Sequence, residues 1–197
     1  MDRKTKQVRH VTTQLQTRAR DDSEMHIEGY FIVFNRETEL WPGAFEEVAP
    51  EALGGLGKTM GLDVKALNNH DPKLVLGRTK AGTLNLKVDE HGLWGDITIN
   101  PNDSDAVNLY ERVKRGDIDQ CSFGFNITSE ETEWRDDGTV KWRITGIDLH
   151  EVSVVTFPAY EDTGVQARKE AVEQHRERLL AAQKTKLKER LRRCLGS

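Results

Sequence analysis

"DIDQCSFGFN", residues 117–126, has the alternation of a β-strand with a serine at its centre. From Cys121 to Ile127 every second residue is apolar, so these side chains share the face of the strand that packs into a core. Ser122 points to the opposite face, where Gly124 has no side chain, and we expect open space above the hydroxyl. A solvent-facing serine on a half-exposed strand explains the same pattern. A nucleophile therefore needs partners elsewhere in the chain.

Short strand patterns surround this stretch. They occur at residues 27–34, 63–67, 74–79, 83–88 and 93–99, and turn residues separate most of them, which favours consecutive antiparallel pairs. A second long strand begins at Ile147, after a hairpin around Asp136-Asp137-Gly138.

Three segments have helical patterns. Residues 45–53 carry a helical spacing that ends at Gly54-Gly55, and residues 102–115 have Asn102 or Asp103 as a cap and Gly116 as a stop. Apolar residues also recur in a basic segment near the end of the chain and predict an amphipathic helix; they are Val172, Leu179, Leu180, Leu187, Leu191 and Leu195. We expect an α+β fold: a mainly antiparallel β-barrel or strongly curved sheet with flanking helices, plus a long C-terminal amphipathic helix.

Charge divides the 197 residues into three parts. Residues 1–20 hold six Lys/Arg against one acid, residues 166–197 ten against four, and residues 21–165 thirteen against twenty-eight. We expect a flexible basic arm at 1–24, a folded domain at 25–165 and a basic amphipathic helical tail at 166–197. The acidic body disfavours nucleic-acid binding, and solvated charge explains the basic ends as well as a partner does.

Cysteine usage and hydropathy exclude several classes of protein. Cys121 and Cys194 lie far apart and outside any Cys/His cluster, so we expect no disulfide framework, no metal site and no cofactor. The polar start and the lack of a long apolar run predict neither a signal peptide nor a membrane anchor. A reducing, cytosolic compartment fits this composition.

Two histidines are candidates to activate Ser122, because the other four lie in the tails or at predicted strand edges and turns. His70 lies in "LNNHDPKLVLGRT", residues 67–79. Asp-Pro separates two predicted strands there, and it holds the imidazole at the end of a strand. His150 lies on the second long strand. A histidine in a loop is more often an exposed polar side chain than a catalytic base.

Glu151 is a candidate third member. Its predicted strand face carries Ile147, Leu149 and Ser153, so its carboxylate needs a cationic or hydrogen-bonding partner. A serine, a histidine and an acceptor behind the histidine form a nucleophilic triad. Alternation alone does not choose between Glu151 and its neighbour His150 for the third role.

Five segments together resemble the prohead (capsid maturation) proteases of tailed bacteriophages, which are related in fold to the herpesvirus assemblins. They are "GYFIVFN" at 29–35, "PGAFEE" at 42–47, the His70 segment, "RVKRGDIDQCSFGF" at 112–125 and "HEVSVVTFPAY" at 150–160, within residues 25–165. The resemblance implies that His70 is the general base, Ser122 the nucleophile and Glu151 the acid. In assemblins a second histidine takes the third role, which His150 could imitate. A backbone N–H is the expected oxyanion donor.

The resemblance also implies a function. Such a serine endopeptidase acts in the host cytoplasm, inside the assembling procapsid, where it cleaves the scaffolding segment of the major capsid protein and then itself. It is expected to be a homo-oligomer, with a dimer as one option. The alternative is a non-catalytic capsid-assembly or scaffold-binding protein with the same fold.

Overall fold

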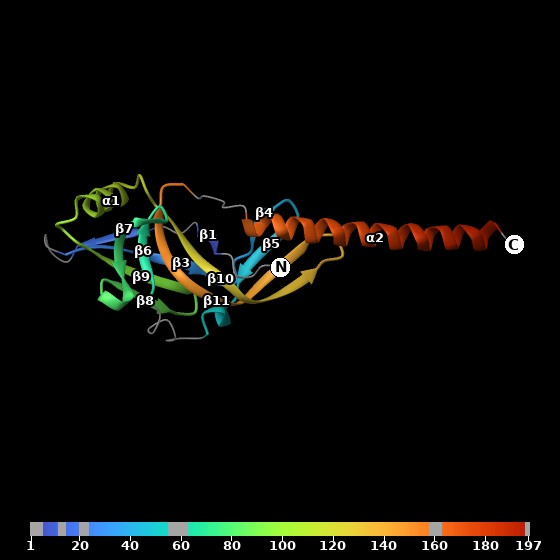
Figure 1. Cartoon of the computed structure of the whole chain (residues 1–197), viewed down its shortest axis with the longest axis horizontal. Helices are drawn as coiled ribbons and strands as arrows, with labels where there is room; N and C mark the ends of the chain where they lie inside the picture. Colours follow the sequence, from blue (N-terminus) through green and yellow to red (C-terminus); the bar gives the residue numbers. More distant parts are fainter. Residues whose placement is uncertain (1–5, 12–14, 20–23, 55–62, 158–162, 196–197) are drawn as a thin grey trace.

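The fold is described by a computed structural model for residues 6–11, 15–19, 24–54, 63–157 and 163–195 (Figure 1). Two sheets, neither closed into a barrel, form its body, and the predicted α+β class is confirmed. No helix within these described ranges is long and apolar enough to cross a membrane.

The larger sheet has seven strands and carries the site. Its strands are β1 (Gln7–Val11), β10 (Gln120–Trp134), β11 (Val140–Val155), β5 (Ala44–Val48), β4 (Thr38–Trp41), β6 (Lys65–Asn68) and β7 (Asp71–Arg78). The order is β1-β10-β11-β5-β4, with β6 and then β7 added beside β11. β11 is long enough to pair in parallel with β5 along its first part and with β6 along its last part. The predicted antiparallel pairing of neighbouring strands is confirmed for β6 and β7, whereas the parallel pairs of β11 were not predicted.

The smaller sheet closes the other side of the core. It has the order β2 (Gln16–Ala19), β3 (Met25–Val33), β9 (Gly92–Ile99) and β8 (Leu84–Val88). Phe31, Ile97, Phe123 and Val152 belong to one buried cluster that joins the two sheets. The predicted core face of β10 is confirmed, because Cys121, Phe123 and Phe125 are buried and Ile127 packs against the same cluster.

Helix α1 (Ser104–Arg115) forms as its end signals predict. The Asp103 side chain accepts hydrogen bonds from the backbone N–H groups of Asp105 and Ala106, and Gly116 ends the helix in a left-handed conformation. Its buried face packs against strands of both sheets.

The helix predicted for residues 45–53 is wrong. Residues 44–48 form strand β5, and only Pro50–Leu53 turn into a short 3₁₀ helix. Pairing with β4 and β11 supplies main-chain hydrogen bonds that outweigh the local helical spacing. Ala49, which precedes Pro50, is extended, as expected for the residue before a proline.

Both ends of the chain add structure to this body. Strands β1 and β2 lie in the stretch expected to be a flexible arm, and that expectation does not hold for them. They join sheet edges through the main chain, and Val8 and Leu15 are buried. The domain boundaries themselves stay a prediction.

Helix α2 (Thr163–Leu195) begins against the larger sheet and then leaves it. Val172 packs with Ala44, Val140 and Trp142, whereas Leu180 and Leu187 are exposed. Figure 1 shows the helix projecting well beyond the sheets. The side chains of Leu179, Leu191 and Leu195 lie outside the described residues.

Candidate active site

His70 occupies a two-residue hairpin turn between β6 and β7. Asn68 and Asp71 are paired across the hairpin, and the two residues between them have positive φ angles, 50° at Asn69 and 59° at His70. Positive φ at both central positions is typical of a type I′ turn, and residues other than glycine adopt it at an energetic cost. The backbone N–H of Asn69 donates to the Val154 carbonyl oxygen, and the Asn69 side-chain oxygen accepts from the backbone N–H of Thr156; both bonds offset this cost and fix the turn to the end of β11.

The turn brings His70 onto Glu151. The Nδ1 atom of His70 lies 2.7 Å from Oε1 of Glu151, and the Ser153 hydroxyl donates to Oε2 at 2.7 Å. The Lys6 ammonium lies 3.1 Å from Oε1. The side chain of Glu151 is only 4% exposed, so these contacts meet the expectation that a carboxylate at this position needs partners.

A β-bulge decides which residues of β11 face this site. Gly124 pairs with Glu151, but the next residue of β10 pairs with Leu149, so His150 is the extra residue. The bulge places Leu149 in the core, and the expected sharing of one face by Glu151 and Leu149 is therefore wrong. His150 is exposed, and it is Glu151 that contacts His70.

Ser122 lies on β10, the strand next to that of Glu151, and is not open to solvent. Its Cα partner on β11 is Ser153, so the two serines are cross-strand neighbours, and Ser122 is 0% exposed. Its hydroxyl donates a hydrogen bond of 2.8 Å to the carbonyl oxygen of Arg9 on β1. The expectation of open space above Ser122 is wrong, because the side chain is buried and its hydroxyl is bonded to β1.

Gly124 makes room for the carboxylate rather than for solvent. A Cβ atom built on Gly124 would lie 2.3 Å from Oε1 of Glu151 and 2.5 Å from Cε of Lys6. Both distances are shorter than real contacts allow. The missing side chain two residues after the serine is therefore a condition for the position of Glu151.

The environment of Glu151 sets its charge. Burial raises the pKa of the carboxyl group, but the hydrogen bond and the charge of His70, with smaller effects of Ser153 and Lys6, bring the pKa below its ordinary value. An ionised carboxylate only accepts hydrogen bonds, so the proton in the contact belongs to Nδ1 of His70. In the neutral imidazole, Nε2 is then the basic nitrogen.

The amino-acid sequence is similar to those of known proteins. Residues 13–178 match the family model described as caudovirus prohead serine protease. The chain belongs to this family. The chain is 28% identical over 153 residues to the prohead protease of Enterobacteria phage HK97, across 76% of this chain and 62% of that protein. It thus spans less than two thirds of the length of this relative. No solved structure matches the chain significantly.

Membership of the prohead serine protease family confirms the resemblance found in the sequence. The matched range includes His70, Ser122 and Glu151, whereas strand β1 lies before it. The roles of the three residues stay a prediction, which their arrangement supports.

The N-terminal contacts of the site in this family member were not predictable from sequence periodicity. Lys6 and Arg9 reach it from a stretch without strand periodicity, and only the pairing of β1 with β10 brings them there. The contact of Ser153 with Glu151 could be predicted, because the two residues are two positions apart on a strand and so share a face.

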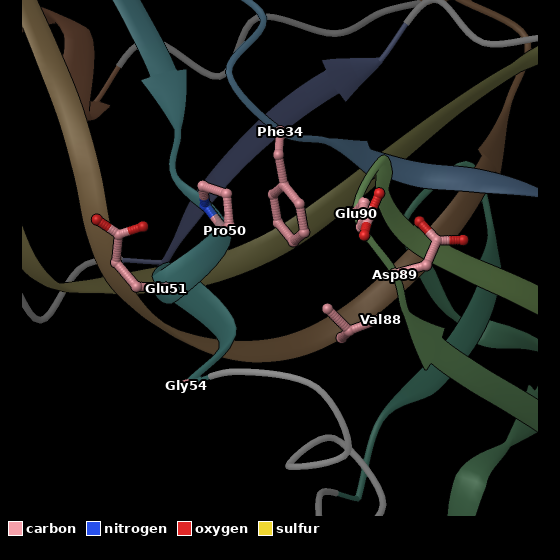
Figure 2. A pocket seen from close by; sticks show the side chains of 7 residues that line it. All are labelled: Phe34, Pro50, Glu51, Gly54, Val88, Asp89 and Glu90. Atoms are coloured by element: carbon pink, nitrogen blue, oxygen red, sulfur yellow. The ribbon is translucent and has the colours of Figure 1, made fainter.

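A separate cavity of about 630 Å³ opens elsewhere on this prohead protease family member (Figure 2). Phe34 and Val88 point into it, with the carboxylate of Glu51 on one side and those of Asp89 and Glu90 on the other. Asp89 accepts hydrogen bonds from the Tyr30 hydroxyl and from the backbone of its own turn. The cavity holds none of the three proposed site residues, so the candidate chemistry lies at His70 and Glu151.

Proposed function

We propose that this chain is a serine endopeptidase in which Ser122 is the nucleophile, His70 the general base and Glu151 the residue that orients the base. The observation that carries the proposal is the 2.7 Å contact between His70 and Glu151, with Ser122 one strand away beside Ser153. The pieces come from a hairpin turn and two strands that are far apart in the sequence. A binding protein has no evident use for this set.

The chemistry follows from these positions. The Ser122 oxygen adds to the scissile carbonyl carbon while Nε2 of His70 takes the hydroxyl proton. His70 then gives that proton to the leaving amine as the C–N bond breaks, which leaves an ester on Ser122. A water molecule loses its proton to His70, attacks the ester and releases the acid. Ser122 regains its hydrogen from His70.

Glu151 assists each proton transfer without being protonated itself. Its lowered pKa keeps it ionised at neutral pH, so it holds the Nδ1–H tautomer and stabilises the imidazolium that forms at His70. The Ser153 hydroxyl fixes the second carboxylate oxygen, so the acid cannot rotate freely.

The proposed substrate is the scaffolding segment of a major capsid protein, and afterwards the protease itself, inside an assembling procapsid in the host cytoplasm. Family membership and the likeness to the HK97 prohead protease support this assignment. Homo-oligomer formation stays a prediction.

The burial of Ser122 favours the second candidate, an assembly protein that keeps the fold without cleaving. One comparison separates the two. Wild type, Ser122→Ala and Ser129→Ala are each co-expressed with the capsid protein; Ser129 is an exposed serine on the same strand. We expect Ser122→Ala to lower processing by about 10³-fold or more and Ser129→Ala to leave it unchanged. Processing by Ser122→Ala at the wild-type rate would overturn the proposal.

A further inference from the structure

Strand β1 is an extended segment that pairs with β10, the strand that carries Ser122. It pairs antiparallel with β10 from Gln7 opposite Phe125 to Val11 opposite Cys121, which places His10 opposite Ser122. The carbonyl oxygen of Arg9 lies 2.8 Å from the Ser122 oxygen. A main-chain carbonyl group is thus adjacent to the proposed nucleophile.

Two ion pairs hold β1 in this place. The Lys6 ammonium binds Oε1 of Glu151, the same oxygen that His70 contacts. The Arg9 guanidinium binds both carboxylate oxygens of Glu46, at 2.5 and 3.0 Å. Gln7 and Val8 between them are buried. The strand is therefore docked at several points along the site.

With β1 in this position, Ser122 cannot act as a nucleophile. A hydroxyl group has one hydrogen, so Ser122 cannot donate it to Arg9 and transfer it to His70 at the same time. The hydrogen bond runs to the carbonyl oxygen and not to the carbon that a nucleophile attacks. Ser122 is also 0% exposed, which leaves no path for a second peptide while β1 is in place.

We propose that β1 is an autoinhibitory strand that occupies the position of the substrate. An extended segment of the polypeptide substrate displaces it and pairs antiparallel with the β10 edge, where main-chain hydrogen bonds supply affinity. Displacement also withdraws Lys6 from Glu151 and frees the Ser122 hydroxyl. The inference rests on the proposed function, since it assigns a substrate position to the same site.

A disulfide lock tests the inference in the full chain. Cα atoms of antiparallel partners lie about 4.5–5.5 Å apart, within the range that a disulfide spans. Val11→Cys therefore places a thiol opposite Cys121, with Cys194→Ser as the background. The readout is the labelling rate with a fluorophosphonate probe, in which the Ser122 oxygen bonds to phosphorus and fluoride leaves.

We expect the oxidised Val11→Cys protein to be labelled at least about tenfold more slowly than the same protein after reduction, because the lock prevents β1 from leaving. The matched control joins β2 to β3 through Ala19→Cys and Met25→Cys, which are also partners. Its labelling rate should not depend on oxidation. Equal rates for the oxidised and reduced Val11→Cys proteins would overturn the inference.

An opening variant tests the same inference in the other direction. Arg9→Glu places a carboxylate against Glu46 and should release β1, so labelling should become severalfold faster than in wild type. A synthetic peptide of residues 6–13 should then slow the labelling again by pairing with the vacant β10 edge. A rate equal to or below that of wild type would contradict the inference.

Ser122→Ala separates this inference from the proposed function. If Ser122→Ala is labelled as fast as wild type, the probe does not report Ser122 and the proposed function fails first. If Ser122→Ala abolishes labelling but neither the lock nor Arg9→Glu changes the rate, the nucleophile stands and only the role of β1 is wrong.

Discussion

Two buried glutamates bind basic side chains of the N-terminal segment, yet their other partners differ. Glu46 lies between two guanidinium groups, those of Arg9 and Arg168, and Arg168 also covers the Trp142 ring at 4.6 Å. Glu151 is bound by an imidazole and a hydroxyl group, with Lys6 at the side. The main partners of Glu46 are guanidinium groups, which keep their charge. The main partner of Glu151 is an imidazole, which can gain and lose a proton.

This difference separates a structural carboxylate from a candidate catalytic one. Arginine keeps its proton throughout the physiological range, so the Glu46 cluster can only hold β1, β5 and α2 together. Histidine titrates near neutrality and can pass a proton on while its acid partner stays ionised. A buried acid beside histidine is therefore the stronger functional candidate, although both acids have lowered pKa values.

The largest expected effect is on catalysis. Glu151→Gln removes the charge that holds the Nδ1–H tautomer of His70, and we expect the rate of Ser122 labelling by fluorophosphonate to fall about 10³–10⁴-fold. Glu46→Gln should raise this rate, because it loosens the Arg9 contact that holds β1 in place. Equal losses in the two variants would mean that the comparison does not identify the catalytic acid.

The free energy of unfolding should depend strongly on Glu46. Glu46→Ala leaves the guanidinium of Arg168, whose side chain is 2% exposed, with less compensation, and we expect a loss of about 3–5 kcal/mol. Glu37→Ala is the matched control. Its side chain is 36% exposed and pairs with Arg135 and Lys141, so about 0.2–1 kcal/mol is expected. Urea denaturation followed by tryptophan fluorescence measures both. A loss for Glu46→Ala no larger than for Glu37→Ala would contradict the structural role.

The acid dependence of stability follows from the Glu46 environment. Burial raises its pKa, but the charges of Arg9 and Arg168 and their hydrogen bonds bring it below the ordinary value of 4.5. The folded state therefore binds this proton less readily than the unfolded state does. Its contribution to stability is complete above about pH 4.5 and is lost as pH falls through the lowered pKa.

Glu46→Gln should accordingly be less stable than wild type at neutral pH but lose less stability on acidification. Free energies of unfolding in urea at pH 7, 5, 4 and 3 give the slope for each protein. Parallel slopes would show that other carboxylates carry the acid sensitivity.

The sequence predicted those features of the fold and the site that depend on residues close together in the chain. The alternation in β10 placed Ser122 opposite the core face, and Asp103 and Gly116 fixed the ends of α1. A need for partners at Glu151 was predicted and is met, although the apolar residues on which that prediction rested face the core and Glu151 does not. These signals lie within a few residues of the feature that they predict.

The rest depends on contacts that sequence periodicity does not encode. Strand β1 is held by main-chain pairing, so the stretch looks like a flexible arm, and the docking of Lys6 and Arg9 was missed with it. The bulge at His150 changes which residues of β11 face the core, because the register of β10 shifts against β11. Residues 45–48 follow a helical spacing but are extended, because they pair with β11.

The smallest expected effect is at His150, the neighbour that competed with Glu151 for the third role. It lies at the bulge, its side chain is exposed, and the acid next to it contacts His70. His150→Ala should leave the labelling rate of Ser122 within about twofold and the free energy of unfolding within about 0.5 kcal/mol. Glu151→Gln, measured beside it, supplies the contrast. A large loss of labelling in His150→Ala, with little change in Glu151→Gln, would move the third role to the histidine and leave Glu151 without a catalytic assignment.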